Sequence, residues 1–372
     1  MSTDYEKPYS DFIEAFEKLF RMKINDSVED MCNIITNVLI SKYHLTKNQL
    51  SKIIIKAFQY NCASGENYIK ILKNIGFDNT KIFQIEFPSV DSIEFAVMHD
   101  QIDKFKEYIS QNQIKNNAFI SIPILTKSDD EILFDSYPNH IFSAVLSLIE
   151  ACAYFGSINI FFFLLSNQKY TISKKCLRYA IIGRNTDIIN ECLKENQMDL
   201  KCLRNIVCSH NHQMLEFVLD RNLFTYKDFD GKDLESRAIY EDIIKYQNLK
   251  AVFLLFEKEK NCIVPWCAAF PQTLEILKNE KLPDKTDFRE RNILHYACMS
   301  QNSDIFKFLV GSIKKIDVKY HMTALCFAAE YNNIDAVKIL ISHGANVNAK
   351  HTFLYSISIT ILSHSHSFNI NY

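Results

Sequence analysis

Apolar residues recur at intervals of three and four along most of the chain, which predicts short amphipathic helices arranged in pairs. The clearest pair lies within residues 323–349. Its first helix carries small and apolar residues from Leu325 to Ala329, and its second carries them from Ile334 to Ile341. Gly344 follows the second helix, where a glycine typically ends a helix in the left-handed conformation.

Weaker copies of this unit precede it, and the turn between the two helices marks their register. These turns fall at residues 101, 157, 185, 212, 248, 273, 302 and 333. After residue 185, four of the five intervals are 25 to 31 residues long, and the same positions stay apolar. Unrelated helices would not keep this spacing, so the pattern predicts an array of repeats. The one interval of 56 residues contains residues 111–140, which are either an insertion or one eroded copy.

Residues 1–88 do not show this period. Asp26 and Ser27 are typical of a helix start, and Gly76 is typical of a helix end. The apolar pattern there predicts helices over residues 11–21, 28–43, 47–60 and 67–75. We therefore expect a separate helical N-terminal domain over residues 1–88, which also covers the apolar end of the array.

The repeat array is predicted to run over residues 89–350, with copies that diverge up to about residue 260 and are clearest over residues 287–350. Residues 351–372 form an atypical C-terminal tail, because they are apolar and lack a helix-capping pattern. A terminal repeat normally presents a polar outer face. The tail is either an improvised cap or the altered end of a longer array, and we favour the second.

Composition narrows the class of protein. Of the 372 residues, 48% are hydrophobic and 23% are charged, which is typical of a globular chain. The 42 Lys and Arg residues nearly balance the 44 Asp and Glu residues, so the chain lacks the basic excess of a nucleic-acid binder. Seven glycines are few for the phosphate loops of a doubly wound nucleotide-binding fold. A mostly helical chain is expected.

The N-terminal residues have no basic start followed by an apolar core, so we expect no secretory signal. The longest apolar run, Ile160–Leu165, is far too short to span a bilayer. The eleven cysteines are an odd number, and several lie within apolar helical patterns. In a reducing compartment such cysteines behave as small buried hydrophobes. These features predict a soluble cytoplasmic protein with no membrane partner.

The motifs of common catalytic and metal sites are missing from the sequence. It contains no phosphate loop, no Gly-x-Ser-x-Gly elbow and no His-Glu-x-x-His. A zinc site at Cys202, Cys208, His210 and His212 would rest on spacing alone, and the repeat register gives Cys208 and His212 packing positions. A calcium loop at residues 228–233 would place Tyr226 and Arg237 where acidic ligands are needed. We therefore predict no catalytic residue, no metal and no cofactor.

The clearest copy carries a family resemblance. Residues 323–329, 335–340 and 344–349 resemble an ankyrin repeat, and residues 292–317 resemble a second, looser copy. The whole layout resembles the divergent ankyrin-repeat proteins expanded in protozoan parasites, which have a helical N-terminal domain of unassigned role. The resemblance implies an all-α fold, an α-solenoid of ankyrin-type helix pairs preceded by a small helical N-terminal domain.

Some residues match the family and others depart from it. Thr323 is expected to cap its helix, and Leu325, Val337 and Leu340 are expected to fill the space between repeats. His295 keeps the family's histidine position, but Cys326 replaces it in the clearest copy. Proline after the capping residue is missing in every copy.

The resemblance also implies a function. In this family the finger tips and the first helices line a concave surface that commonly binds other proteins, so we expect a non-enzymatic interaction module and a protein partner. Tyr and Arg lead among the candidate residues because they are enriched in binding hot spots. Carried over by position, the candidates are Lys319, Tyr320, Met322, Glu330, Tyr331, Phe288, Arg289, Arg291, Met299, Ser300, Tyr154 and Phe155.

Two alternatives stay open at this point. The N-terminal domain could carry an unrecognised activity while the repeats act as a targeting scaffold, or the whole chain could be a structural spacer. We expect a monomer that binds no nucleic acid.

Overall fold

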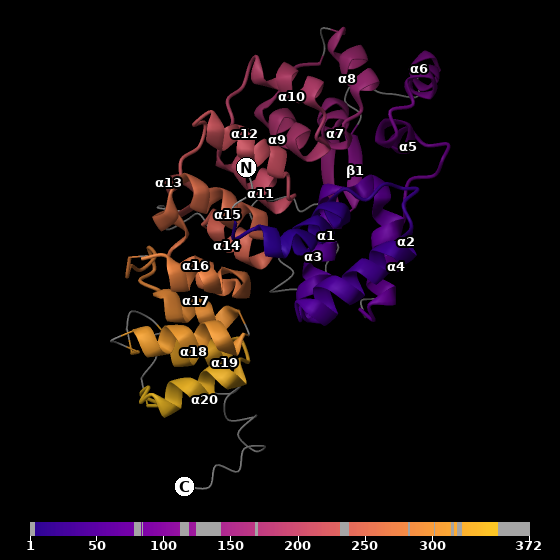
Figure 1. Ribbon diagram of the computed structural model, residues 1–372. Coiled ribbons are helices and arrows are strands. Elements are labelled where there is room, and N and C mark those ends of the chain that lie inside the picture. The colour runs from indigo at the N-terminus through magenta and orange to yellow at the C-terminus, as the bar shows by residue number, and fades with distance from the viewer. Residues whose placement is uncertain are drawn as a thin grey trace. The chain divides into compact units, whose positions relative to one another are not determined.

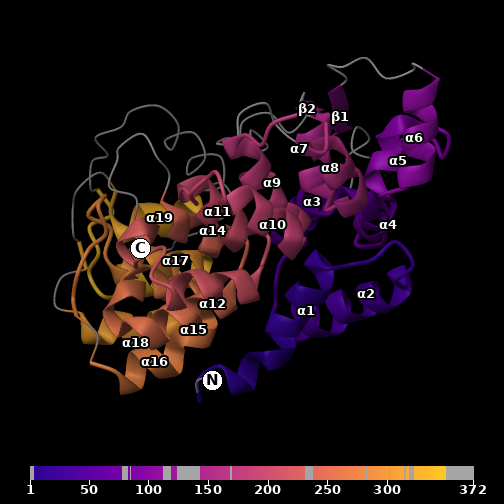
Figure 2. The same cartoon turned by 90° about the horizontal axis from the view of Figure 1, so that it is seen from above.

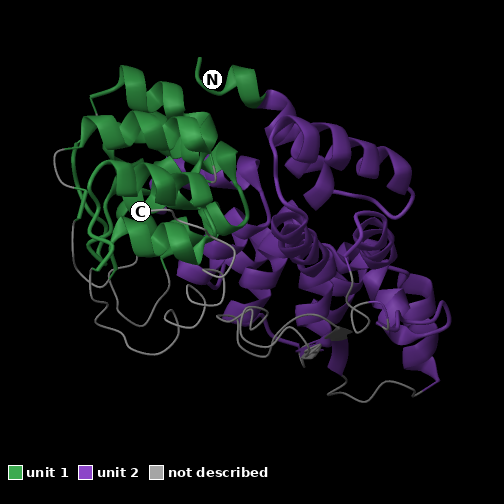
Figure 3. Ribbon diagram, turned by 90° about the horizontal axis from the view of Figure 1, so that it is seen from below, with its two compact units in different colours: residues 1–9, 225–372 green, residues 10–224 purple. Residues whose placement is uncertain are grey.

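The computed structural model describes residues 4–77, 83, 85–111, 119–123, 143–167, 170–230, 238–281, 283–300, 302–313, 316–317 and 322–348. The predicted all-α class is confirmed, since the described residues form helices apart from one two-stranded sheet. They divide into two compact units, unit 1 with residues 1–9 and 225–372 and unit 2 with residues 10–224 (Figure 3). The boundary at residue 88 stays a prediction, and the tail 351–372 lies outside the described residues.

Unit 2 begins with the helices predicted for the N-terminal domain. Ser27 caps the second of them by accepting a hydrogen bond from the main-chain nitrogen of Asp30 at 3.1 Å. Gly76 has a φ of 75° after the last of them, as its position predicts. The elements are α1 (Ser10–Phe20), α2 (Val28–Ile34), the π-helix η2 (Ile35–Lys42), α3 (Lys47–Tyr60), the 3₁₀-helix η3 (Cys62–Ser64) and α4 (Gly65–Asn74).

Four helix pairs follow in unit 2, at the predicted positions of the weaker repeats. Each pair buries an apolar face formed by both helices, as with Cys176, Ala180 and Ile188 of the third pair. The pairs are α5 (Ile93–Met98) with α6 (Ile102–Ser110), α7 (Leu148–Phe155) with α8 (Ile158–Leu165), α9 (Lys174–Gly183) with α10 (Thr186–Leu193), and α11 (Leu200–Cys208) with α12 (His212–Asp220).

A short antiparallel sheet was not expected from the sequence. Strands β1 (Phe119–Pro123) and β2 (Ser143–Ser147) lie beside α7 (Figure 2). Ile120 pairs with Leu146, and both side chains are buried, whereas Phe119 and Val145 are exposed. This alternation of buried and exposed residues is typical of a strand. The described residues of the long interval are therefore not an intact helix pair.

Unit 1 continues the array, and its helices succeed one another from α13 to α20 along the orange-to-yellow part of Figure 1. Helix α17 packs against α19, and α18 packs against α20. The elements are η1 (Lys7–Tyr9), α13 (Lys227–Asp230), α14 (Ile239–Lys245), α15 (Leu249–Lys258), η5 (Lys260–Ile263), η6 (Trp266–Ala269), η7 (Pro271–Thr273), α16 (Leu274–Asn279), α17 (Ile293–Met299), α18 (Ser303–Ser312), α19 (Ala324–Glu330) and α20 (Ile334–Ser342).

The copy whose turn was predicted at residue 273 is irregular. Its first helix is reduced to the 3₁₀-helix η6, which lies between Pro265 and Pro271. Proline disfavours the helical conformation of the residue before it, and Phe270 before Pro271 is extended, so the helix that begins after Pro265 ends within about one turn. The side chain of Trp266 fills the core and donates a hydrogen bond to the carbonyl oxygen of Cys262 at 3.1 Å.

The turn between paired helices has one recurring geometry. A residue with positive φ ends the first helix, and the next residue is the N-cap of the second helix; these left-handed residues are Asp100, Gly156, Arg184, His210, Gln247 and Asn332. In the last turn the Asn333 main-chain nitrogen donates to the Ala328 oxygen at 2.8 Å, and the Asn333 side chain accepts from the Ala336 nitrogen at 3.0 Å. The residue that closes one helix therefore also starts the next. This geometry confirms the predicted register to within one residue.

Close approach of two helices in unit 2 requires glycine. Gly183 ends α9, and a Cβ atom added to it would lie 2.2 Å from the carbonyl oxygen of Ala153 in α7. Gly156, which follows α7, has a φ of 72°, a conformation that favours glycine. Any side chain at Gly183 would push α7 and α9 apart.

The last described pair differs from the pair before it in burial. Thr323 caps α19, and Gly344 has a φ of 85°, as predicted. Leu340 is fully buried, but Leu325 and Val337 are only half-buried, whereas Leu294 and Phe306 in the same positions of the preceding pair are fully buried. The prediction that all three residues fill the space between repeats is therefore correct for Leu340 alone.

Candidate functional site

The finger between α16 and α17 is closed by one carboxylate. The Oδ1 atom of Asp287 accepts hydrogen bonds from the main-chain nitrogens of Arg289 at 2.9 Å and Arg291 at 2.7 Å. The main-chain nitrogen of Asp287 donates to the carbonyl oxygen of Arg291 at 3.0 Å. These bonds fix the backbone of the tip, which carries Phe288 and Arg289.

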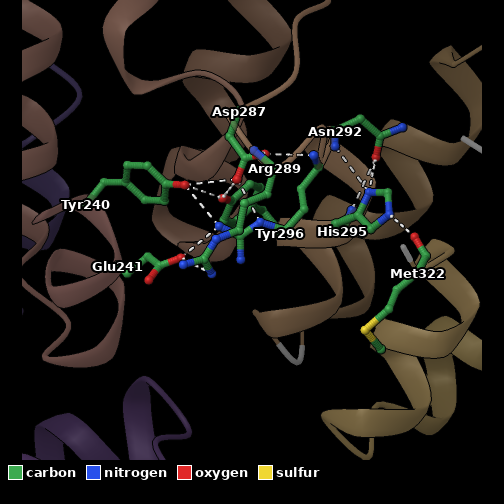
Figure 4. A network of polar contacts seen from close by, with 9 residues as sticks. Tyr240, Glu241, Asp287, Arg289, Asn292, His295, Tyr296 and Met322 are labelled. Atoms are coloured by element: carbon green, nitrogen blue, oxygen red, sulfur yellow. Dashed lines mark hydrogen bonds and ion pairs between the residues drawn. The ribbon is translucent and has the colours of Figure 1, made fainter. Parts of the chain in front are cut away.

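The other oxygen of Asp287 joins the finger to two helices (Figure 4). Oδ2 accepts from the hydroxyl of Tyr240 in α14 at 2.9 Å, from the hydroxyl of Tyr296 in α17 at 2.7 Å, and from Nε of Arg291 at 2.7 Å. The Asp287 side chain is only 3% exposed. Nη2 of Arg291 also donates to Glu241 at 2.8 Å, and Nη1 of Arg289 donates to the same carboxylate at 3.0 Å. The positive charges of the two arginines therefore balance the negative charges of Asp287 and Glu241.

Burial and charge fix the protonation states in this network. Burial by itself raises the pKa of Asp287, but the Arg291 guanidinium and the hydrogen bonds outweigh it and hold the pKa of Asp287 below its usual range. Burial raises the pKa of Tyr240 and of Tyr296, so both phenols stay protonated. The network therefore contains an ionised Asp287–Arg291 pair and neutral tyrosines, which suits a fixed scaffold.

A second set of contacts links one finger to the next (Figure 4). Nε2 of His295 lies 3.0 Å from the carbonyl oxygen of Met322, at the start of the following repeat. Asn292 caps α17 by accepting from the main-chain nitrogens of Leu294 and His295. Burial lowers the pKa of His295, which favours a neutral ring. His295 therefore acts as a bridge between repeats.

The predicted binding residues in unit 1 differ in their exposure. Phe288 is 36% exposed, and the Arg289 side chain is 47% exposed, with its guanidinium carbon 5.0 Å from the centre of the Phe288 ring. Glu330 is exposed, and Met299, Met322 and Tyr331 are half-buried. The ring of Tyr331 stacks on Phe327 at 6.1 Å. Tyr320 lies outside the described residues.

Three predicted residues are placed differently from the surface positions expected. Arg291 is 14% exposed and is held by Asp287 and Glu241. Tyr154 is buried, and its hydroxyl donates to the carbonyl oxygen of Gln59. Phe155 is half-buried with its ring edge-on to Tyr154. Their helix positions predicted exposure, but partners distant in sequence bury Arg291 and Tyr154, so neither side chain is open to a binding partner.

Packing accounts for the histidines that resembled zinc ligands. The His210 ring stacks on Phe16 and Phe20 of α1, with ring centres 5.2 Å and 4.4 Å apart. Nδ1 of His212 lies 2.8 Å from a carboxylate oxygen of Glu17. Within the described ranges, no three His, Cys, Asp or Glu side chains are grouped so that they could hold a metal ion. Sequence reasoning missed that these histidines anchor α1, because their spacing does not show their partners Phe16, Glu17 and Phe20.

Two segments of the chain match known family models. Residues 266–351 match the family model described as "Ankyrin repeats (3 copies)". This segment is therefore similar to ankyrin repeats. The finger closed by Asp287 and the His295 bridge both lie within the matched segment. Residues 168–255 match a second model, described as "Domain of unknown function (DUF3447)".

Solved structures also match, among them the ankyrin-repeat domain of human ASB11. It has 13% sequence identity and a TM-score of 0.20, and the match covers 70% of this chain and 86% of that chain. No curated protein sequence matches the chain. Among the helices of the described ranges, none has both the length and the apolar character needed to cross a bilayer.

Proposed function

We propose that the chain is a non-enzymatic interaction module that binds a protein partner through the ankyrin repeats of unit 1. Ankyrin repeats are generally protein–protein interaction modules. The proposed binding face consists of the finger tip and the adjoining helix ends, which carry Phe288, Arg289, Met299, Met322, Glu330 and Tyr331.

The observation that carries this proposal is the fixed but uncovered finger tip. Asp287 holds the backbone on both sides of the tip, while Phe288 and Arg289 keep exposed side chains. A loop that is already ordered loses little conformational freedom on binding, which favours affinity. The exposed Phe288 ring offers a partner apolar contact area, and the Arg289 guanidinium, which pairs with Glu241 through Nη1, has further N–H groups that can donate to the partner.

The chemistry of this face defines the partner. Arg289 supplies a positive charge and Glu330 a negative one, and the methionines supply adaptable apolar surface. A folded protein with a mixed surface fits this pattern better than a polyanion. The near balance of charges along the whole chain supports the same choice.

Affinity capture from the native cell, followed by mass spectrometry, would test the proposal. The intact chain is compared with the variants Phe288→Ala, Arg289→Glu and Tyr331→Ala, which should each reduce capture of the same partner at least about tenfold. Lys307→Ala on α18 is the matched control, because Lys307 is exposed on a second helix. Equal capture by all variants, with unchanged helical circular dichroism, would contradict the proposal.

We also propose a cytoplasmic location for the protein. All eleven cysteines are free thiols, which supports a reducing compartment such as the cytoplasm. We also propose a monomer that binds neither nucleic acid nor membrane. We further propose that the protein is related to the divergent ankyrin-repeat proteins of protozoan parasites, which its layout resembles.

A further inference from the structure

The first described residues pack on a helix of the array. Residues 4–9 precede α1 and belong to unit 1, as the green segment at the N-terminus shows (Figure 3). The ring of Tyr9 stacks on Phe253 of α15 with ring centres 6.4 Å apart, and the ring of Tyr5 meets Phe256 edge-on at 5.9 Å. Two aromatic side chains thus anchor a six-residue segment to α15.

A mostly buried ion pair lies between these anchors. Nζ of Lys250 is 2.8 and 2.9 Å from the two carboxylate oxygens of Glu6. The Lys250 and Glu6 side chains are only 15% and 12% exposed. The hydroxyl of Tyr5 also donates to Glu280 at 3.3 Å. Residues 5–9 thus follow the pattern aromatic–acidic–x–x–aromatic. Tyr5 contacts Phe256, Glu6 pairs with Lys250, and Tyr9 stacks on Phe253.

Helix α15 differs from the other second helices at one position. Phe253 lies five residues after the N-cap Asn248, and it is fully buried. At the same position of other second helices, Lys106, Asn190, Glu216, Lys307 and Lys338 are exposed and polar, and Phe162 of α8 is an aromatic residue that is 38% exposed. Phe253 differs from all of these because it is fully buried, and the ring of Tyr9 stacks on it. We call Lys250, Phe253, Phe256 and Glu280 the α15 face.

We propose that the α15 face is a docking site for short peptide segments of aromatic–acidic–x–x–aromatic chemistry, and that residues 4–9 occupy it in cis as a detachable ligand. The segment contributes only the single turn η1, so it can leave without unfolding a longer helix. A partner segment of the same chemistry then takes its place. This site is separate from the finger tip, so the inference does not depend on the proposed function.

The cis segment should weaken binding in trans by competition. A tethered ligand acts at a high effective concentration, and a site that is free only part of the time shows a proportionally weaker apparent affinity. Releasing the cis segment should therefore strengthen the binding of an added peptide.

The test uses a fluorescent peptide of residues 4–10 and measures its binding to the full chain by anisotropy. The double variant Tyr5→Ser, Tyr9→Ser releases the cis segment and leaves the α15 face intact, so it should bind the peptide about tenfold or more tightly than the unmodified chain. Adding Lys250→Glu to this variant should remove the gain. A peptide with Glu6→Lys should bind that triple variant and restore the affinity, which shows that the triple variant is folded.

Lys307→Glu in the released chain is the matched control, since it places the same charge change on α18 and should leave peptide binding unchanged. Equal binding by the released and unmodified chains would overturn the proposal. Binding that survives Lys250→Glu with the original peptide would overturn it as well. Because these variants leave Phe288 and Arg289 untouched, partner capture through the finger tip reports separately on the proposed function.

Discussion

Nε2 of His295 lies 3.0 Å from the carbonyl oxygen of Met322, so a side chain of one repeat is bonded to the chain that enters the next. A carbonyl oxygen only accepts, and Nε2 therefore carries the ring proton. Nδ1 lies 3.1 Å from the main-chain nitrogen of Asn292 and 2.6 Å from Oδ1 of the same residue. The N-cap residue of α17 therefore holds one ring nitrogen of His295, and the following repeat holds the other.

Replacing His295 with alanine should destabilise unit 1. The change leaves a buried carbonyl without its donor and opens a cavity, so we expect a loss of about 2–4 kcal/mol in the free energy of unfolding. Urea denaturation followed by circular dichroism measures it. Cys326→Ala is the matched control, because Cys326 has the same position in the next repeat but is half-buried, and it should cost less than about 1 kcal/mol. Equal losses would contradict the bridging role.

The neutral state of His295 predicts a pH dependence. Burial lowers the pKa of His295 in the native state, while the unfolded chain titrates near the usual value of about 6.5. Between the two pKa values the unfolded chain binds more protons, so stability increases with pH in this window. The contribution of His295 to the free energy of unfolding should be fully present above about pH 6.5. Below that pH, the free energy of unfolding should fall by up to about 1.4 kcal/mol per pH unit.

Denaturant midpoints between pH 8 and pH 5 check this dependence. Burial also lowers the pKa of His99, but His99 is only half-buried and should contribute less. The variant His295→Gln should therefore show a clearly shallower slope than the unmodified chain. Identical slopes would show that His295 is not the titrating group.

Removing the charge of Asp287 should disturb the finger. Asp287→Asn leaves the mostly buried Arg291 without its closest counter-charge, which should cost about 3 kcal/mol. Tyr296→Phe removes a single hydrogen bond to the same oxygen and should cost about 1 kcal/mol. Urea denaturation compares the two variants. An effect of Asp287→Asn no larger than that of Tyr296→Phe would contradict the ionised pair.

Replacement of glycine by alanine should have opposite effects on stability at Gly183 and at Gly311. Gly183→Ala places a methyl group against the carbonyl oxygen of Ala153, and the resulting overpacking should cost about 1–3 kcal/mol. Gly311→Ala in α18 meets no atom within 4 Å and should stabilise the helix by about 0.5–1 kcal/mol. Thermal melts of both variants provide the comparison. Equal shifts of the melting temperature would contradict the close approach of α7 and α9.

Burial differs between two leucines in the same position of neighbouring repeats. Leu294 is fully buried, and Leu294→Ala should cost about 2–5 kcal/mol as a core truncation. Leu325 is half-buried, so Leu325→Ala should cost less than half as much. The sequence pattern by itself predicts equal costs. Equal measured losses in urea would show that Leu325 is covered in solution.

The helix pairs could be predicted because their determinants are local. Capping residues such as Asn333 and Thr323, and apolar positions at helical spacing, lie within one repeat. The irregular copy at Trp266 also had a local signal in its two prolines, which the apolar pattern outweighed. Strands β1 and β2 were missed because the alternation of five residues is too short to stand out.

The site was harder to predict, because the partners of its polar residues are distant in sequence. Arg291 has the position of a surface residue, but Glu241 lies 50 residues away and pairs with it. Tyr154 is buried by a hydrogen bond to Gln59, 95 residues away. The docking of residues 4–9 left only a weak signal, since Phe253 takes a position that is polar in most other copies but is also aromatic at Phe162.

The turns that join paired helices also determine where the chain tolerates change. Each is closed by hydrogen bonds that span only a few neighbouring residues, as between Asn333 and Ala328. Such a turn keeps its geometry however many residues separate one pair from the next. Extra sequence can therefore be spliced between pairs at little cost in folding, which explains how spacings of 56 and 28 residues coexist in one chain.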